Sequence, residues 1–355
     1  MSFEDGWAAV NLEMPKRVPR VEFSIERYHW RLMQAVTGIE VAARSSEEVK
    51  TKAIQTFYRA WNYDIHLSNM LHKEGLAAKR TNMGHAEWAE DGTDFDDNIQ
   101  EPFSDPEEVL AFDPWQTYGE IDQREWTRRF EAHCREQKER FPTCVNTTGI
   151  YISLITGLMY IFGWEMLLLA AGTDPRRFGE LTNRYAAWIG QYYDALAGAE
   201  IGDAVVYSHD DMVWTEGAIF HPDWYRQYVF PNLKKLWDPL RESGKKILFT
   251  CDGDYTEFID DIAACGNHGF WFEIFTNLEA LAEKYGRTHF LIGNADTRIL
   301  LRGNRDEIRA EVERCMQAGK ALPGYFMSVS NHIPANTPVE SALYYNEVYR
   351  ELSVR

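Results

Sequence analysis

The second half of the chain repeats one pattern five times: an apolar run that ends in polar residues, then a helix-length amphipathic segment. The runs occupy residues 204–211, 246–254, 270–275, 289–296 and 325–333. A continuous apolar run of this kind predicts a parallel strand buried on both faces, and each run with its helix predicts one βα unit. Such units close into a barrel or wind an open sheet.

In both architectures the carboxyl ends of the strands face the active site. The polar residues that end the five runs are therefore the first candidates for chemistry. They are His209, Asp210, Asp211, Thr250, Asp252, Glu273, Asn294, Asp296, Asn331 and His332.

The length of 355 residues allows two small domains or one large barrel, and no Pro/Gly/Ser-rich linker or low-complexity tract divides the chain. We expect one α/β domain over residues 1–355, a (β/α)8 barrel with a helical and irregular amino-terminal extension in which residues 1–20 form an irregular arm. Apolar residues make up 45% of the chain, with 12 Trp, 18 Tyr and 19 Phe, which is enough to fill a sizeable core.

The net charge of -18 argues against binding to nucleic acid or to an anionic membrane surface, because phosphate binding needs clustered Lys and Arg. It also disfavours strongly anionic substrates unless a local basic pocket exists. The amino terminus lacks the basic start and apolar stretch of a signal peptide, and no run approaches the roughly 18 apolar residues of a membrane span. We expect a cytoplasmic protein.

The five cysteines show no CxxC pair and no close Cys/His spacing. That pattern predicts reduced, mostly buried thiols rather than a disulfide framework or a structural zinc site. Cys251, at a strand end, is the one cysteine expected near the site.

Other segments carry weaker signals. Strands are expected at residues 21–24 and 63–67, and helices near 27–37, 46–61, 120–141 and 174–199. The most apolar stretch, residues 149–172, is interrupted by Gly157 and Gly163 and contains Glu165. We therefore expect a barrel strand or loop that passes into a buried helix rather than a membrane span.

Residues 83–113 are acidic, turn-rich and poorly periodic. A long irregular segment in a compact α/β protein is often a lid or an active-site loop. The alternative is a solvated acidic hairpin on the surface, since charge runs usually face solvent.

Three adjacent ionisable residues, His209, Asp210 and Asp211, end the first of the five runs. Burying them is costly unless they are paired, bound to a metal or functional. Because neighbours along a strand point to opposite faces, we expect one carboxylate to enter the site and the other to fix a loop or helix start. The alternative is a pair of hydrogen-bonding loop anchors.

Two further acids end later runs. Asp252 precedes Gly253 at the start of a predicted helix, so a catalytic or substrate-binding role competes with that of a helix cap or turn residue. Glu273 lies inside an apolar aromatic run, which favours either a raised pKa or a compensating partner; the rival interpretation is a buried ion pair.

Histidines elsewhere are weaker candidates. His66 and His85 are each isolated, and a lone His is more often structural than a ligand. Together, His85, His209, Glu273 and His332 provide the nitrogen and oxygen donors of a mixed metal site, although their spacing alone does not demonstrate one. The sequence contains no GxGxxG, P-loop, HExxH or GxSxG motif, so dinucleotide, nucleotide, zincin and serine-hydrolase functions have no support.

Residues 200–350 resemble the uroporphyrinogen decarboxylase superfamily, which includes the corrinoid-dependent methyltransferases. The resemblance rests on the strand that ends in Asp-Asp, then HPDWYRQYVFPNLKKL, LFTCDGD, IGNADTRILLRG, DEIRAEVERCMQAGK and SVSNHIPANTPVESALYY. It implies a TIM (β/α)8 barrel.

The chain departs from both branches of that superfamily. Thiol-methylating members resemble one another in a His-x-Cys motif and a late Cys, and the matching positions here are Thr250, Asp252 and Asn331. A thiolate-rich zinc site of that pattern is absent. True decarboxylases share an early RQAGRY pattern that PKRVPRVEFSIERYHW lacks, and Asp64 is the counterpart proposed for their essential Asp. A multiply anionic tetrapyrrole is also a poor electrostatic match to this charge.

The resemblance implies a methyltransferase component that moves a methyl group from a small O-methyl or N-methyl compound to a corrinoid carried by a separate protein. Breaking such a bond needs a polarised or protonated leaving group, which zinc or a carboxylic acid can supply. The candidate residues are Asp211, Glu273 and Asp252 for catalysis, His85, His209, Asp210 and His332 for the metal, and Asp64, His66, Trp214, Thr250, Asn294, Asp296 and Asn331 for the substrate.

Two alternatives stay open: a cofactor-free decarboxylase that uses a carboxylate such as Asp64, and a small-molecule binding barrel without catalysis. Barrels of this superfamily often pair, so a homodimer is one expectation. The carboxyl-terminal segment VESALYYNEVYREL is amphipathic, and covering its own barrel is the commoner role for such a helix.

Overall fold

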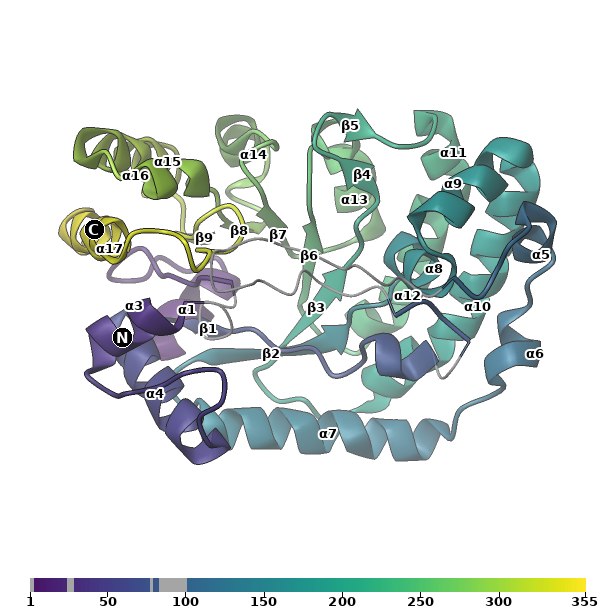
Figure 1. The fold of residues 1–355 in the computed structure, drawn as a ribbon, viewed down its shortest axis with the longest axis horizontal. Helices are drawn as coiled ribbons and strands as arrows, with labels where there is room; N and C mark the ends of the chain where they lie inside the picture. Colours follow the sequence, from purple (N-terminus) through teal and green to yellow (C-terminus); the bar gives the residue numbers. More distant parts are fainter. Residues whose placement is uncertain (1–2, 24–28, 77–78, 83–100) are drawn as a thin grey trace.

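Seven parallel strands curl into the wall of a barrel. The computed structural model describes residues 3–23, 29–76, 79–82 and 101–355 (Figure 1). The sheet order is β1-β2-β3-β6-β7-β8-β9. The strands are β1 (Ile65–His66), β2 (Val145–Ile150), β3 (Val205–His209), β6 (Ile247–Cys251), β7 (Gly269–Phe272), β8 (Phe290–Ile292) and β9 (Tyr325–Phe326). All neighbours in this order pair in parallel.

The segment around Arg20 closes the barrel between the first and last strands. Arg20 forms parallel bridges with both Tyr63 and Met327. The Asp64 N–H donates to the Arg20 carbonyl at 2.8 Å, and the Val21 N–H donates to the Met327 carbonyl at 3.2 Å. A further parallel bridge joins Phe23 to His332. This segment takes the eighth place in the wall, which confirms the predicted TIM barrel.

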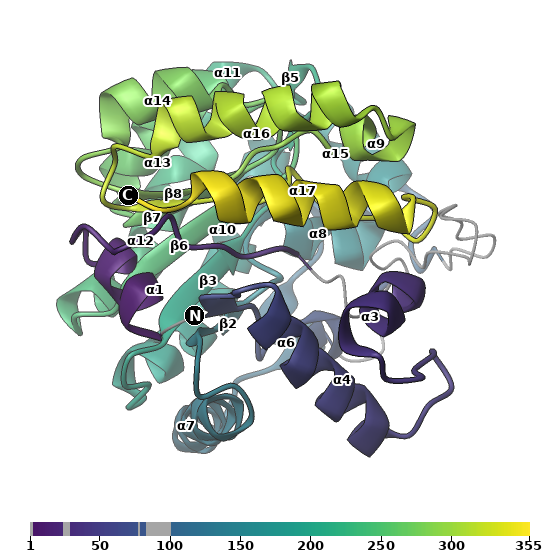
Figure 2. The ribbon, with the colours of Figure 1, turned by 90° about the vertical axis from the view of Figure 1, so that its left-hand side faces the viewer.

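Helices cover the outside of the barrel (Figures 1 and 2). They are α3 (Trp30–Thr37), α4 (Glu47–Ala60), α7 (Gln123–Arg140), α10 (Pro175–Gly198), α11 (Pro222–Tyr228), α12 (Phe230–Glu242), α13 (Ile259–Cys265), α14 (Leu278–Tyr285), α15 (Thr297–Arg302), α16 (Arg305–Gly319) and α17 (Val339–Leu352), with short 3-10 turns η1 (Lys73–Leu76) and η2 (Thr256–Phe258). The helix α17 packs against α3, α15 and α16, so it covers its own barrel.

The apolar stretch at 149–172 continues from β2 into two helices, α8 (Ile155–Phe162) and α9 (Trp164–Thr173). All eight residues of α8 are buried. Gly163 lies between the helices at φ 77°, a conformation that favours glycine, and the pair bends there by 109°. Among the described residues, no single helix has the length and apolar character to cross a membrane; this bent pair is the one combination that meets those criteria.

Several elements differ from the sequence-based expectations. Residues Phe3–Val10 form a helix, α1, within the arm expected to be irregular. The segment expected to be an acidic loop contains α5 (Pro106–Leu110), and α6 (Pro114–Tyr118) follows. Asp105 and Asp113 accept N-cap hydrogen bonds and each precedes a proline at N1, so the Asp-Pro pairs are helix starts rather than turns.

A small hairpin of β4 (Val213–Trp214) and β5 (Gly217–Ala218) follows β3. Its Trp214 carbonyl accepts the Asp254 N–H at 2.9 Å, which ties it to the loop after β6. Gly253 in that loop has φ 83°, and a Cβ there would lie 2.4 Å from the Trp214 carbonyl oxygen. Glycine is therefore required for the hairpin to dock beside the strand ends.

Candidate active site

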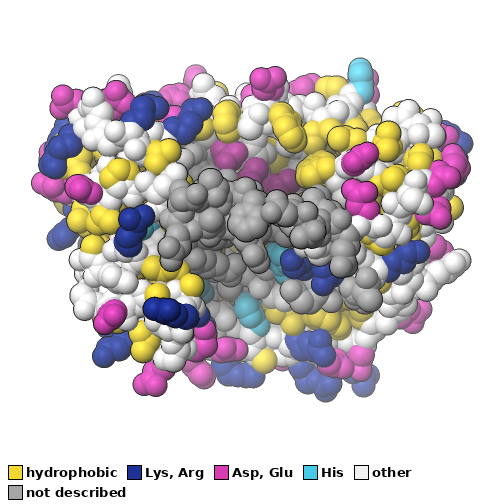
Figure 3. Space-filling model, in the orientation of Figure 1, with side chains coloured by type: hydrophobic (Ala, Val, Ile, Leu, Met, Phe, Trp, Pro, Cys, Tyr) yellow, Lys and Arg dark blue, Asp and Glu magenta, His cyan; other side chains and the backbone are white. Residues whose placement is uncertain are grey.

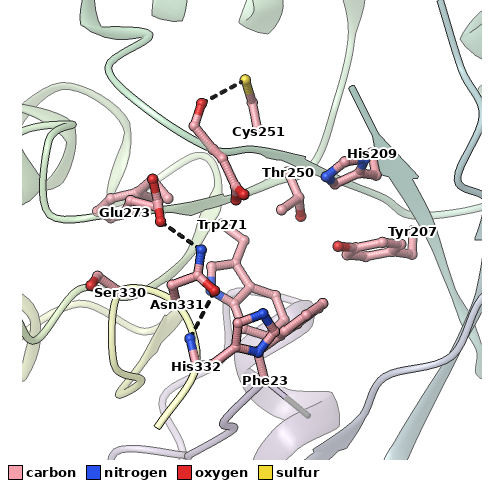
Figure 4. Close-up of a pocket in the computed structure, with 12 residues that line it drawn as sticks. Phe23, Tyr207, His209, Thr250, Cys251, Trp271, Glu273, Ser330, Asn331 and His332 are labelled. Carbon is pink, nitrogen blue, oxygen red and sulfur yellow. Dashed lines mark hydrogen bonds between the residues drawn. The ribbon is translucent and has the colours of Figure 1, made fainter. Parts of the chain in front are cut away.

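A pocket opens at the carboxyl ends of the strands (Figure 4). Its lining combines acids, aromatic rings and amides: Phe23, Tyr207, His209, Thr250, Cys251, Asp252, Trp271, Phe272, Glu273, Ser330, Asn331 and His332. No Lys or Arg occurs among these described lining residues. Figure 3 shows acidic side chains in the central hollow of the same side of the molecule.

His209 and Asp211 meet at the end of β3. The His209 Nε2 atom lies 3.0 Å from Asp211 Oδ1. Tyr151 stacks on the His209 ring at a centroid distance of 4.0 Å and an interplanar angle of 11°, which fixes the plane of the imidazole. These contacts hold the imidazole edge beside the carboxylate.

Asp210 points in the opposite direction. Its Oδ1 accepts the Thr156 N–H at 2.8 Å in the first turn of α8, and the Thr156 hydroxyl accepts the Asp211 N–H at 2.7 Å. Burial raises the pKa of Asp210 to about 7, although the Thr156 N–H acts against the rise. One of the two adjacent carboxylates thus enters the site and the other fixes a helix start, as predicted. Asp210 was predicted as a metal ligand, and the structure instead places its carboxylate on α8.

Asp252 follows β6 and approaches the same point. Its N–H donates to Asp211 Oδ1 at 3.1 Å. Asp252 is an exposed residue that lines the pocket. Burial and the neighbouring Asp211 and Glu273 carboxylates raise its pKa well above the ordinary range. A bound proton or a neighbouring cation would therefore stabilise the Asp252 carboxylate.

Glu273 is held at both oxygens. The Gly253 N–H donates to Oε2 at 2.7 Å, and the Asn331 amide donates to Oε1 at 2.6 Å (Figure 4). Burial raises the pKa of Glu273 and the Asp211 charge adds to the rise, while both hydrogen bonds lower it. The two donors hold both carboxyl oxygens of Glu273 in fixed positions.

One ligand atom each from His209, Asp211 and Asp252 lies within 4.8 Å of the others, the one such group of three found among the described residues. One imidazole and two carboxylates form a donor set that suits a divalent cation. The predicted ligand His332 lies in the pocket lining outside this trio. His85 falls outside the described residues. The sequence analysis named His209 as a metal ligand and gave Asp211 and Asp252 catalytic roles.

Aromatic rings form the opposite wall. Phe23 meets Trp271 edge to face, with centroids 5.7 Å apart at 84°, and its ring lies 4.8 Å from the His332 ring. Tyr207 lies beside His209 on the far side (Figure 4). The sequence analysis did not select Phe23, Tyr207 or Trp271. In the sequence these residues are marked only by the high aromatic content of their segments. The strands of any barrel core share that feature, so it does not distinguish a site residue.

Two predicted substrate residues lie away from the pocket. Asp64 precedes β1, at the amino-terminal end of a parallel barrel, where it pairs with Arg17 and accepts the Arg20 N–H at 2.8 Å. His66 contacts Tyr58 and Gln137 outside the barrel, with both distances 3.1 Å. Neither prediction is supported, because parallel strands carry the site at their carboxyl ends and His66 faces the helices.

The remaining predicted residues divide between lining and support. Thr250 and Asn331 line the pocket. Asn294 lies behind it and donates to the carbonyls of Glu273 at 3.2 Å and Thr276 at 3.0 Å. Asp296 caps α15 and pairs with Arg298, which lowers its pKa, and Trp214 has 62% of its surface exposed on the hairpin. These last three residues do not line the described pocket.

Comparison with known proteins agrees with this architecture. The family model for uroporphyrinogen decarboxylase (URO-D) matches residues 102–352. The uroporphyrinogen decarboxylase of Carboxydothermus hydrogenoformans is 28% identical over 179 residues, 50% of this chain and 49% of that protein. A Thermus thermophilus uroporphyrinogen decarboxylase is 27% identical over 157 residues, 44% of each chain. The chain thus spans about half the length of the curated relatives it matches.

Among solved structures, a methyltransferase from Methanosarcina mazei superposes with a TM-score of 0.66 at 16% identity and covers 99% of both chains. A likeness at this identity shows the fold. The seven parallel strands, the closing segment and this superposition together establish the TIM barrel.

Proposed function

The chain belongs to the uroporphyrinogen decarboxylase family, and from that premise we propose that it is a methyltransferase of the corrinoid-dependent branch. It takes a methyl group from a small O-methyl or N-methyl compound and passes it to the cobalt of a corrinoid on a separate protein. The full-length likeness to a protein named a methyltransferase supports this assignment.

The observation that carries the proposal is the trio of His209, Asp211 and Asp252 beside an aromatic pocket without Lys or Arg among its described lining. One ligand atom each from His209, Asp211 and Asp252 lies within 4.8 Å of the others. The two carboxylates repel each other at this distance, and a divalent cation between them would remove that repulsion. A bound cation would also stabilise the ionised form of Asp252, whose pKa is raised by burial and by the Asp211 and Glu273 carboxylates.

His209, Asp211 and Asp252 would hold a divalent ion, which when bound would supply Lewis acidity to the leaving heteroatom of the methyl donor. The chain contributes the rest of the site. The stacked Tyr151 ring and the Asp252 N–H fix the directions of the ligands, since ligand orientation depends on the contacts behind them. Glu273, fixed by Gly253 and Asn331, orients the substrate rather than acting as the predicted proton donor.

In this proposal the corrinoid is carried by a separate protein, which brings the cobalt to the carboxyl ends of the strands.

The decarboxylase alternative has less support. Uroporphyrinogen carries many carboxylates, and its recognition needs basic side chains. The described lining offers none, and the residue expected to serve as the essential acid, Asp64, lies at the other end of the barrel with Arg17.

The test measures metal and methyl transfer together. The purified chain is analysed for bound metal and then mixed with cob(I)alamin and a panel of O-methyl and N-methyl compounds, and formation of methylcobalamin is followed by absorbance. We expect stoichiometric metal and metal-dependent methylation. His209→Ala or Asp252→Asn, which each remove one ligand, should lower the metal affinity and the rate of methylcobalamin formation by at least about tenfold. Glu283→Gln, on the exposed face of α14, should change neither quantity.

Release of carbon dioxide from uroporphyrinogen without methyl transfer would establish the decarboxylase instead. Ligand-dependent thermal stabilisation with neither reaction would establish the non-catalytic binding barrel.

A further inference from the structure

The strands around the pocket bring their side chains to it in two successive rows. The register aligns Thr250 with His209 on one side and with Trp271 on the other. Two residues further along these three segments follow the acids Asp211, Asp252 and Glu273. Because parallel strands run toward the mouth, later residues lie nearer to it. The acids therefore form an outer row, and Thr250 lies in an inner row, deeper in the barrel.

The inner part of the pocket contains two buried hydroxyl groups. Tyr207, which precedes His209 on β3, is 2% exposed, and Thr250 on β6 is 7% exposed. Both residues line the pocket, and Figure 4 shows their hydroxyl groups directed toward its centre. Neither hydroxyl oxygen has a hydrogen bond of ordinary geometry in the part of the chain that the structure describes.

The two hydroxyl groups are neighbours. Burial raises the pKa of the Tyr207 phenol, and the Thr250 hydroxyl acts against the rise. Each group carries one proton that it can donate. If one hydroxyl donates to the other, the second proton still has no acceptor, so the pair presents at least one O–H donor to the pocket. A buried donor without an acceptor is costly, and a ligand that supplies an acceptor atom there is favoured.

The acids of the outer row have other donors. Glu273 accepts the Gly253 N–H and the Asn331 amide, one at each oxygen. Asp211 contacts His209 and accepts the Asp252 N–H. The acceptor for the two hydroxyls is therefore expected from a ligand. The described lining contains no Lys or Arg, so a negatively charged acceptor would be buried without a basic partner, and a neutral oxygen is the better match.

We propose that Tyr207 and Thr250 form a subsite for a neutral oxygen acceptor, such as a carbonyl, hydroxyl or ether oxygen, at the inner end of the ligand. The inference rests on the proposed function, which identifies this ligand as the methyl donor, and deepens it. The donor then carries an oxygen that binds the two hydroxyls, and its methyl group faces the mouth. Compounds whose inner end is wholly apolar or anionic bind poorly.

Fluorine NMR titration of the purified chain tests the subsite with three probes of matched shape. They are trifluoroethyl methyl ketone, the alkene in which a methylene group replaces the ketone oxygen, and trifluoropropanoate. Each is titrated before and after dialysis against EDTA. We expect the ketone to bind at least about fivefold more tightly than the alkene in both states, because the hydroxyls and not a metal bind its oxygen. After dialysis the ketone should also bind more tightly than trifluoropropanoate.

Two substitutions each remove one hydroxyl and keep the shape of the side chain. Tyr207→Phe should lower the ratio of ketone to alkene affinity about fivefold, and Thr250→Val should lower it about twofold. The double variant should lose the preference, while the alkene affinity stays within about twofold of the wild type. A merely structural role would weaken both probes alike. Tyr344→Phe on α17, outside the pocket lining, is the matched control and should leave the ratio unchanged.

Three results would overturn the inference: a ketone that binds no more tightly than the alkene, an unchanged ratio in the double variant, or tighter binding of trifluoropropanoate than of the ketone after dialysis. Selective ketone binding by a chain that transfers no methyl group to cob(I)alamin would support the subsite and remove the proposed function. Methyl transfer without that selectivity would do the reverse.

Discussion

The two ends of the barrel hold their acids in opposite ways. At the amino-terminal end, Asp64 is completely buried and pairs with Arg17. At the carboxyl-terminal mouth, Asp211, Asp252 and Glu273 lie near one another, and the described lining provides no Lys or Arg. Burial raises the pKa of Asp64 to about 6 although Arg17 acts against the rise. Acids at both ends therefore have raised pKa values, and the two ends differ in whether an arginine pairs with the acid.

In the closing segment, as at the amino-terminal end, a buried acid pairs with an arginine. Arg20 and Glu22 are buried and lie 2.8 Å apart, and Arg20 also lies over the rings of Trp61, Tyr345 and Tyr349. An acid matched by its own cation is part of the scaffold. The acids at the mouth contact His209 and neutral amides, and the described lining there provides no Lys or Arg; that difference points to the mouth as the candidate site.

The largest effect is expected from breaking the matched pair. Glu22→Gln should lower the free energy of unfolding by about 3–5 kcal/mol, because it leaves the Arg20 charge buried without its counter-ion. Urea unfolding measures the loss. The double variant Arg20→Met, Glu22→Leu should recover most of it, since no buried charge remains; a double variant as unstable as the single one would contradict the comparison.

A smaller effect is expected at Asp210, whose carboxylate accepts a hydrogen bond from the amino terminus of α8 rather than from Lys or Arg. Its folded pKa of about 7 means that the folded chain keeps a proton that the unfolded chain releases above about pH 4. The free energy of unfolding should therefore fall as the pH rises from about 4 to about 7, by at most about 1.4 kcal/mol per pH unit.

Asp210→Asn keeps the oxygen that accepts the Thr156 N–H and removes the titrating group. Urea unfolding at several pH values should show a flatter profile and a variant more stable than the wild type at about pH 8. The same profile in wild type and variant would show that another group controls this pH range.

The smallest effect is expected at Trp214. Its side chain is 62% exposed, and the contact to the β6 loop comes from its carbonyl. Trp214→Ala should change the free energy of unfolding by no more than about 0.5 kcal/mol and leave the bound metal unaltered. Loss of bound metal in this variant would show that the trio depends on the hairpin side chain.

Much of the fold was predictable because each βα unit carries its own signal. The five apolar runs became β3, β6, β7, β8 and β9, and the helices expected at 46–61, 120–141 and 174–199 are α4, α7 and α10. Short strands such as β1, with two residues, and the bridges at Arg20 carry little local pattern. Their pairing depends on the strands on either side.

The candidate site was predictable as a location and less so as an arrangement. Strand ends selected His209, Asp252, Glu273 and Asn331, which line the pocket, and Asp211, which lies beside His209 and Asp252, because parallel strands bring these ends to one edge. The same reasoning also selected Asp296, whose carboxylate turns back to cap a helix. Capping and catalysis use the same residue types at the same positions of a βα loop, so the sequence does not separate them.

The sequence by itself determined the βα repeat, the barrel and the end of the barrel at which chemistry occurs, since periodicity and strand direction are local properties of the chain. Only the tertiary structure decided which acids have cations. Arg17 and Asp64 are distant in sequence and pair at one end, while Asp211, Asp252 and Glu273 come from three different strand ends and meet at the other. Charge balance depends on distances through space, and the folded chain alone sets those distances.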